Sequence, residues 1–306
     1  MSVSLRQLRY FVAAAEAGTI AGGAAAMHVS QSAIALAVGE LEKVLDVQLF
    51  LRQRAKGLTI TKAGVSVLAD ARSLLSHSQE LVDSARSRGR DLSGPLAVGC
   101  YMTLAPFLMP ASLEGFAAEH PRVQLTFAEG SQVDLQTRLL DGETEIALLY
   151  RLDLQPGIHH EVLYETRPYV LLPQDHRLAR RSAVDLNDLA DEPMIMLDYP
   201  PSVHYFTELL SSAGVTPRVQ HTTASFETVR SLVGRGLGYS LLIQRPTAQI
   251  SYEGLPLVHC SIKQRVPPMP VLAAWPEGAK LTRRATAFVE FCHRTFHAGP
   301  VAPAQR

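Results

Sequence analysis

The sequence has no apolar run long enough to cross a bilayer. Its apolar segments, such as residues 169–172, are short, whereas a membrane span needs roughly 18 residues. Cysteine is also scarce: Cys100, Cys260 and Cys292 are odd in number and far apart, which fits a reduced cytosolic protein rather than a disulfide scaffold. Residues 1–7 hold no basic segment that leads into an apolar core, so we expect no secretory signal. We therefore set aside secreted and membrane proteins and expect a cytoplasmic location.

An excess of either charge is also absent, because 29 lysines and arginines balance 29 aspartates and glutamates. The balance is uneven along the chain: residues 1–90 carry 11 basic residues against 7 acidic ones, and the remainder carries 18 against 22. A basic N-terminal part indicates contact with nucleic acid or a membrane surface, although chance fluctuation explains the imbalance equally well. The 306 residues, 47% of them hydrophobic, are typical of a globular protein of about two to three domains.

The first 60 residues predict three short helices and a hairpin. Apolar side chains recur at helical spacing over 5–15, an alanine-rich stretch spans 20–27, and Ser30 is a suitable N-cap for the helix that follows. Two helices joined by a short turn form a helix-turn-helix, whose second helix enters the major groove of DNA. Residues 49–60 predict a β-hairpin, or wing, with a basic tip that carries Arg52, Arg54 and Lys56.

A longer helix is predicted from its N-cap, Thr61, to about residue 87. Leu68, Leu75 and Val82 lie seven residues apart on it, which is the spacing of a coiled-coil seam. We therefore expect these side chains to hold a homodimer. The alternative is that the helix packs this face on its own domain.

From residue 94 onward, strands alternate with helices. The order strand–helix–strand–helix–strand over 96–150 predicts a parallel sheet covered by helices. A second unit of the same kind is predicted from strands at 169–172, 193–197, 219–222 and 239–243. The chain then returns through 271–275 to a final helix at 282–296. We expect two lobes, two crossing strands and a cleft between the lobes.

Particular segments of the chain resemble the LysR-type transcriptional regulators. Near the N-terminus they are residues 5–11 (LRQLRYF), 29–31 (VSQ), 40–42 (ELE), 49–50 (LF) and 58–64 (LTITKAG). Further along they are residues 168–173 (PYVLLP), 176–179 (HRLA) and 233–239 (VGRGLGY). The resemblance covers essentially the whole chain.

This resemblance implies an α+β multidomain fold in three parts. Residues 1–60 would form a winged helix-turn-helix DNA-binding domain, and residues 61–90 a linker helix for dimerisation with a hinge. Residues 91–306 would form a two-lobed α/β effector-binding domain like periplasmic binding proteins, with lobe I at about 94–165 plus 270–300 and lobe II at about 166–268. The family also implies three partners: double-stranded operator DNA, a small-molecule effector, and further copies of the chain in a homodimer and often a tetramer.

The predicted recognition helix departs from the family pattern S-Q-P-A-x-S-x-Q-I. Here Ser30 and Gln31 are followed by a mostly apolar outer face. Arg, Lys, Asn and Gln supply most bidentate contacts to bases, so DNA binding would depend more on phosphate contacts from the wing and on DNA shape. The predicted DNA-binding residues are Ser30, Gln31, Ser32, Ala35, Leu36, Arg52, Arg54 and Lys56.

The loops at strand ends predict the effector site, because ligands of open α/β sheets bind beyond the C-terminal ends of the strands. The family's effector contacts commonly include a hydroxyl residue after the first strand, which Thr103 matches; the alternative is that Thr103 only caps its helix. Aromatic side chains in these loops indicate a ligand with apolar or ring character, while Asp198 and Glu129 would suit an amino group. The predicted effector-binding residues are Tyr101, Met102, Thr103, Ser131, Asp198, Tyr199, Ser202, Thr223 and Phe226.

Enzyme chemistry has little support in the sequence. The glycines of 234–238 end a helix and enter a strand, the reverse of a dinucleotide fingerprint, so we expect no cofactor. The adjacent Cys and His residues at 259–260 and 292–293 point apart, so we expect no metal site. The sequence thus indicates a ligand-responsive DNA-binding regulator that is not an enzyme. The alternative is a small-molecule-binding protein of the same architecture with weakened sequence-specific DNA binding.

Overall fold

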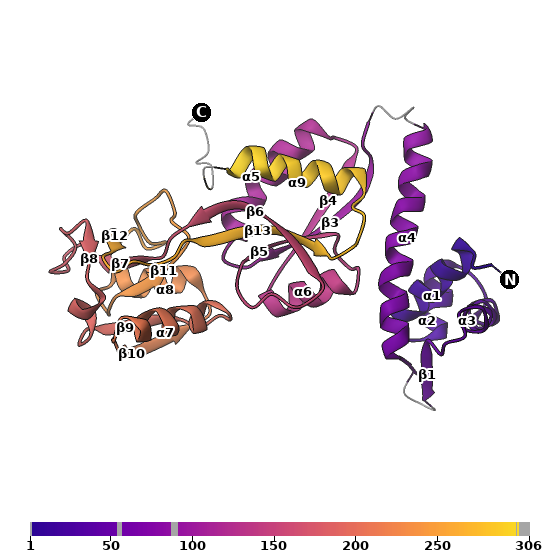
Figure 1. Cartoon of the computed structure of the whole chain (residues 1–306), viewed down its shortest axis with the longest axis horizontal. Coiled ribbons are helices and arrows are strands. Elements are labelled where there is room, and N and C mark those ends of the chain that lie inside the picture. Colours follow the sequence, from indigo (N-terminus) through magenta and orange to yellow (C-terminus); the bar gives the residue numbers. More distant parts are fainter. Residues whose placement is uncertain (1, 54–56, 87–90, 298, 300–306) are drawn as a thin grey trace.

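The molecule extends in three parts along its long axis, with one long helix, α4, between the first part and the rest (Figure 1). This computed structural model describes residues 2–53, 57–86, 91–297 and 299, and only the backbone of Arg52, Gln53 and Arg86. We call helices α1–α3 with hairpin β1–β2 the head. The C-terminal domain consists of lobe I, next to α4, and lobe II at the far end.

Three capped helices build the head: α1 (Leu5–Ala17), α2 (Ile20–Met27) and α3 (Gln31–Leu45). The hydroxyl groups of Ser4, Thr19 and Ser30 each accept a hydrogen bond from a backbone N–H in the first turn that follows. The apolar faces of the helices meet in one core, which includes Leu8, Phe11, Ile34, Leu41 and Leu49. The predicted helix-turn-helix is therefore present.

The wing is an antiparallel hairpin, as expected. Strand β1 (Phe50–Gln53) pairs with β2 (Gly57–Ile60). The Leu58 N–H donates to the Gly18 carbonyl oxygen 2.9 Å away, which ties the hairpin to the end of α1.

Helix α4 (Lys62–Arg86) confirms the predicted long helix, and the Gly64 N–H donates to Thr61 Oγ1 at 2.9 Å, as an N-cap should. The structure corrects part of the expected dimer seam. Leu68 is buried in the core of the head and Leu75 packs against that core, because α1 covers this face of α4. At these two positions the own-domain alternative describes the packing.

The apolar surface that α4 leaves open lies on the adjoining face. Leu74 is 52% exposed and Leu81 is 72% exposed, seven residues apart, and Val82 is exposed beside them. Leu74 and Leu81 therefore offer a partner helix two exposed apolar side chains at heptad spacing. Each lies one residue before a position of the predicted seam, Leu75 and Val82.

Lobe I is a five-stranded sheet in the order β4-β3-β5-β13-β6. Strands β3 (Gly94–Tyr101), β4 (Val123–Gly130) and β5 (Ile146–Tyr150) are parallel, as expected. Strand β13 (Met269–Pro276) runs antiparallel to both β5 and β6 (Ile158–Thr166). Helices α5 (Ala105–Glu119) and α9 (Arg283–Phe296) cover one face of the sheet, and α6 (Gln132–Leu140) covers the other (Figure 1).

Lobe II holds two sheets, a parallel pair β10-β9 and a mixed sheet in the order β11-β7-β12-β8, so the expectation of a second fully parallel unit is wrong. Only β9 (Pro193–Leu197) and β10 (Arg218–Thr223) pair in parallel as full strands with the expected helix between them. Strand β7 (Tyr169–Pro173) lies antiparallel between β11 (Ser240–Leu242) and β12 (Leu257–Ile262), because it enters lobe II directly from β6 with no crossover helix. The short strand β8 (Ala183–Val184), the 3₁₀ turn Leu186–Leu189, α7 (Ser202–Ser212) and α8 (Phe226–Gly234) complete the lobe.

Two chain segments connect the lobes, as the late return of the chain predicts. One is the short link between β6 and β7, and the other joins β12 to β13. The guanidinium of Arg167 in the first segment donates to the Val266 carbonyl oxygen of the second at 2.8 Å, so the two crossings are fastened together.

Among the described residues, no single helix is long and apolar enough to span a membrane. The two helices that would reach the required length together, α2 and α3, are bent by 109° at their junction.

Candidate DNA interface and effector cleft

The start of α3 is fixed by its own serines. Ser30 Oγ accepts the Ala33 N–H at 3.2 Å and lies 2.9 Å from Ser32 Oγ. The Ser30 hydroxyl is therefore already engaged in capping. The other residues that the sequence placed at DNA on this helix are exposed or half-buried: Gln31, Ser32, Ala35 and Leu36.

The predicted phosphate contacts concern residues of the wing tip. Arg54, Lys56 and the side chain of Arg52 lie outside the described residues, so their role stays a prediction. Lys43 is an exposed basic residue in the last turn of α3, on the same side of the helix as Ser32. Lys43 follows Ser32 by eleven residues, or about three helical turns, so both lie on the same face of α3. The sequence-based prediction did not use this spacing.

The predicted effector site is a small cavity between the two lobes. A cavity of about 10 Å³ remains there, which is about the size of one water molecule. The predicted residues Thr103, Ser202 and Phe226 meet at it, the first from lobe I and the others from lobe II. The full lining is Thr103, Tyr150, Leu197, Ser202, Phe206, Phe226, Leu242, Ile243 and Gln244, and none of these side chains carries a charge at neutral pH.

A chain of hydrogen bonds forms the floor of the cleft. The Gln244 side-chain amide donates to the Tyr150 hydroxyl at 3.0 Å. The Tyr169 hydroxyl donates to the backbone carbonyl oxygen of Gln244 at 3.0 Å. The Thr103 side chain lines the same cavity as Tyr150. Burial raises the pKa of Tyr150 well above its usual value, so its phenol stays neutral and keeps a proton to donate.

Thr103 does not cap its helix. The N-cap of α5 is Leu104, whose side chain makes no capping bond, and proline in the first turn needs no acceptor for its nitrogen. The Thr103 side chain is nonetheless buried, and it lines the cavity between the lobes together with Tyr150.

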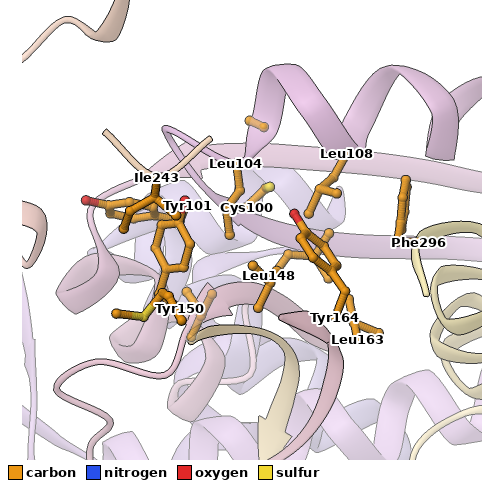
Figure 2. Close-up of a cluster of buried hydrophobic side chains, with 14 of the residues drawn as sticks. Cys100, Tyr101, Leu104, Leu108, Leu148, Tyr150, Leu163, Tyr164, Ile243 and Phe296 are labelled. Atoms are coloured by element: carbon orange, nitrogen blue, oxygen red, sulfur yellow. The ribbon is translucent and has the colours of Figure 1, made fainter. Parts of the chain in front are cut away.

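The hydroxyl of Tyr101, a residue that we expected to contact a ligand, is bonded to lobe II. Its hydroxyl reaches across the cleft to Ser202 Oγ at 3.1 Å and to the carbonyl oxygens of Tyr199 and Pro200 at 3.3 and 3.2 Å. Its ring meets the Tyr150 ring edge-on, with centroids 5.5 Å apart, within the buried cluster of Figure 2. Tyr101 therefore joins the two lobes with a hydroxyl that is already occupied.

The other predicted effector residues surround the cleft without lining the cavity. Met102 and Asp198 are exposed, so Asp198 does not supply a charge to the cavity. Ser131 caps α6, and Thr223 Oγ1 accepts the Ser225 N–H at 3.3 Å. The Tyr199 ring packs on Tyr101 with centroids 5.5 Å apart.

Sequence reasoning missed two polar residues of the floor, Tyr150 and Gln244. Tyr150 ends β5, the third parallel strand, so the strand-end argument used for the first two strands would have found it. Gln244 follows β11 in an irregular loop, and nothing in the local sequence distinguishes it from a solvated glutamine.

The described part of the chain holds no group of three or more His, Cys, Asp or Glu side chains placed to bind a metal ion. Cys100, Cys260 and Cys292 are free and buried.

Comparison with known proteins supports both halves of this description. Residues 5–65 match the model of the bacterial regulatory helix-turn-helix protein, lysR family, and residues 89–297 match the LysR substrate binding domain. The second match alone covers more than half of the chain. The chain belongs to the LysR family of transcriptional regulators.

Relatives align with the chain over nearly its whole length. YvbU of Bacillus subtilis, an uncharacterised HTH-type transcriptional regulator, is 29% identical over 97% of this chain and all of its own. The crystal structure of HinK, a LysR family regulator from Pseudomonas aeruginosa, is 35% identical with a TM-score of 0.66, covering 97% of this chain and 99% of its own. A full-length OxyR variant from the same organism has a TM-score of 0.73 at 25% identity, covering 95% and 98% of the two chains.

LysR-family regulators bind DNA through the helix-turn-helix domain, which is the head of this chain. The C-terminal domain is the effector-binding domain of the family, and the cleft between lobes I and II lies within it.

Proposed function

We propose that this protein binds a specific operator sequence and that a small molecule in the interlobe cleft changes this binding. The observation that carries the proposal is the buried floor of the cleft, where Thr103, Tyr150 and Gln244 of both lobes meet around a cavity. A few convergent polar groups in an otherwise apolar pocket are typical of a small-molecule site. On this account the protein performs no chemistry on the effector.

The size of the cavity suggests how an effector would act. Because only about 10 Å³ is open, any organic molecule has to part the lobes or turn Phe226 aside. The Phe226 ring already packs edge-on against Phe107 of lobe I, with centroids 6.0 Å apart, so moving it also separates an interlobe contact. Binding would thus favour a more open arrangement of the lobes.

The lining also restricts the chemistry of the effector. A charged group would lose its hydration without meeting an opposite charge, because the lining consists of hydroxyl, amide, aliphatic and aromatic side chains. We therefore infer a small uncharged effector with a ring or apolar body and one or two hydrogen-bonding atoms. The amino group that Asp198 suggested is not favoured, since Asp198 lies outside the cavity lining.

A second copy of the chain is part of this proposal. The exposed face of α4 with Leu74 and Leu81 would form the seam of a homodimer, and two dimers would make a tetramer. Two heads related by a two-fold axis would meet two half-sites on DNA. A regulator of this kind would act in the cytoplasm, where it reaches the DNA.

The experiment is a thermal-shift screen of the full-length chain. Neutral phenols and aromatic amides are compared with benzoates and benzylamines of the same shape, and each hit is titrated by calorimetry. We expect a neutral compound to bind, and Thr103→Val to weaken it about tenfold through the loss of one hydrogen bond. The control is Thr207→Val, because Thr207 is exposed on α7 and bonds only to its own helix.

Two outcomes would contradict the effector assignment. Equal affinity in Thr103→Val and the wild type would remove Thr103 from the site. A hit that binds in the cleft but leaves the affinity for DNA unchanged would contradict the proposed control of DNA binding by the small molecule.

A further inference from the structure

Helix α3 carries two stripes of opposite character. Its inner stripe, which includes Ile34, Val38 and Leu41, is buried in the core of the head. Steps of four, three and four residues return to the same side of a helix, and on the opposite side they define an outer stripe. This outer stripe consists of Ser32, Leu36, Gly39 and Lys43.

Leu36 is the large apolar side chain of the outer stripe, and it is 65% exposed. A single exposed leucine is common and by itself indicates nothing. Leu36, however, lies in the second turn of the second helix of a helix-turn-helix, which is the part that meets base edges in the major groove. Ala35 beside it is also apolar, and the exposed charge one turn further along, Glu40, accepts a hydrogen bond from the Gln7 side-chain amide at 3.2 Å.

Gly39 supplies a second, independent observation. A Cβ atom added at Gly39 would meet nothing within 4 Å, so no packing inside the described chain requires glycine there. Glycine inside a helix is less stable than alanine, and its advantage is that another surface can approach the backbone closely. Gly39 lies about one turn after Leu36 on the same side, where that surface would also touch Leu36.

Only one group in the major groove rewards an apolar contact. Thymine presents its C5 methyl group there, whereas the other base edges present hydrogen-bond donors and acceptors. We propose that Leu36 reads the methyl group of a thymine in each half-site, and that Gly39 leaves room for the groove wall beside it. The inference rests on the proposed function, because it assumes specific binding to DNA.

The test removes the methyl group from the DNA and leaves the protein intact. Selection from a random duplex library with the full-length chain supplies the probe. Each thymine of the selected site is then replaced in turn by deoxyuridine, which lacks only the C5 methyl. At one position in each half-site we expect the dissociation constant to rise about fourfold, as for the loss of one buried methyl group.

Two variants assign that effect to α3. Leu36→Ala should bind the thymine and deoxyuridine probes equally, whereas Val133→Ala, an exposed apolar residue on α6, should still distinguish them. Gly39→Ala should raise the melting temperature of the head while weakening DNA binding, a combination that a purely structural role would not produce.

The outcomes separate this inference from the proposed function. If the protein prefers its selected site but no deoxyuridine substitution changes affinity, thymine reading is overturned while specific binding stands. If Leu36→Ala still senses the methyl group, another residue reads it and the assignment to Leu36 falls. If selection recovers no preferred sequence, the proposed function itself fails.

Discussion

The hydroxyl oxygen of Tyr101, at the end of the first strand of lobe I, lies 3.1 Å from Ser202 Oγ, at the start of the first helix of lobe II. Both residues are buried. This contact joins the lobes through side chains, whereas the two crossing segments join them through the chain itself. The separation of Tyr101 from Ser202 is therefore a measure of cleft opening.

Tyr101→Phe removes this contact and keeps the ring. We expect the free energy of unfolding of the C-terminal domain to fall by about 0.5–1.5 kcal/mol, the usual net value of one hydrogen bond. Urea denaturation measures the change. The control is Tyr252→Phe, since Tyr252 is 90% exposed, and equal stability of the two variants would show that the contact does not hold the lobes.

Leu81→Asp tests the dimer seam. Leu81 is 72% exposed in the single chain, so a charge there should leave the folding of the chain nearly unchanged. In a dimer the carboxylate would be buried without a partner, at a cost of several kcal/mol. Sedimentation should show monomers for Leu81→Asp and unchanged assembly for Val133→Asp on α6. Intact dimers of Leu81→Asp would place the seam elsewhere.

Glu145→Gln tests the attachment of α4 to lobe I. Glu145 accepts from Arg284, which is only 1% exposed, at 3.1 Å, and from the Ser76 hydroxyl of α4 at 3.3 Å. Without the carboxylate, the buried guanidinium loses its ion pair and keeps only the more distant carboxylates of Glu80, Asp83 and Asp91, which line the same pocket, so we expect a loss of about 1.5–3 kcal/mol in stability. The surface pair Arg294–Glu119 is the comparison, because Glu119→Gln should cost less than about 1 kcal/mol. A similar small loss in both variants would contradict the structural role of the buried pair.

The three cysteines should be inert in the folded protein. Burial raises the pKa of Cys100, Cys260 and Cys292 above the usual thiol value, so at pH 8 each stays in the unreactive neutral form. Ellman's reagent should label them only after denaturation. Rapid labelling of the native protein at pH 8 would contradict this and would reopen a redox role.

The sequence was sufficient for the elements that local signals define. The caps at Ser30 and Thr61 follow from hydroxyls that accept backbone N–H bonds, and both are present. The order of strands and helices likewise predicts the two lobes and their two crossings. The spacing of the apolar residues switches between the strand and helix periods where one element ends and the next begins.

The misplaced features depend on contacts between distant segments. Leu68 and Val82 occupy equivalent positions of the predicted heptad pattern, and only the position of α1 decides that the first is buried and the second open. Tyr101 has the expected strand-end position, but its hydroxyl is taken by lobe II, a neighbour that no local pattern specifies. Gln244 joins the cleft floor for the same reason, through a loop nearly one hundred residues after Tyr150.

The central claim is that the head recognises a particular DNA sequence. Fluorescence anisotropy of the full-length chain on its selected site, against a duplex of the same composition in shuffled order at physiological salt, tests it most directly. Specific protein–DNA complexes are typically at least about 10³-fold tighter than non-specific ones, and we predict a preference of this order. Equal affinity for the two duplexes, lost in parallel as salt rises, would show binding through phosphates alone and would contradict the claim.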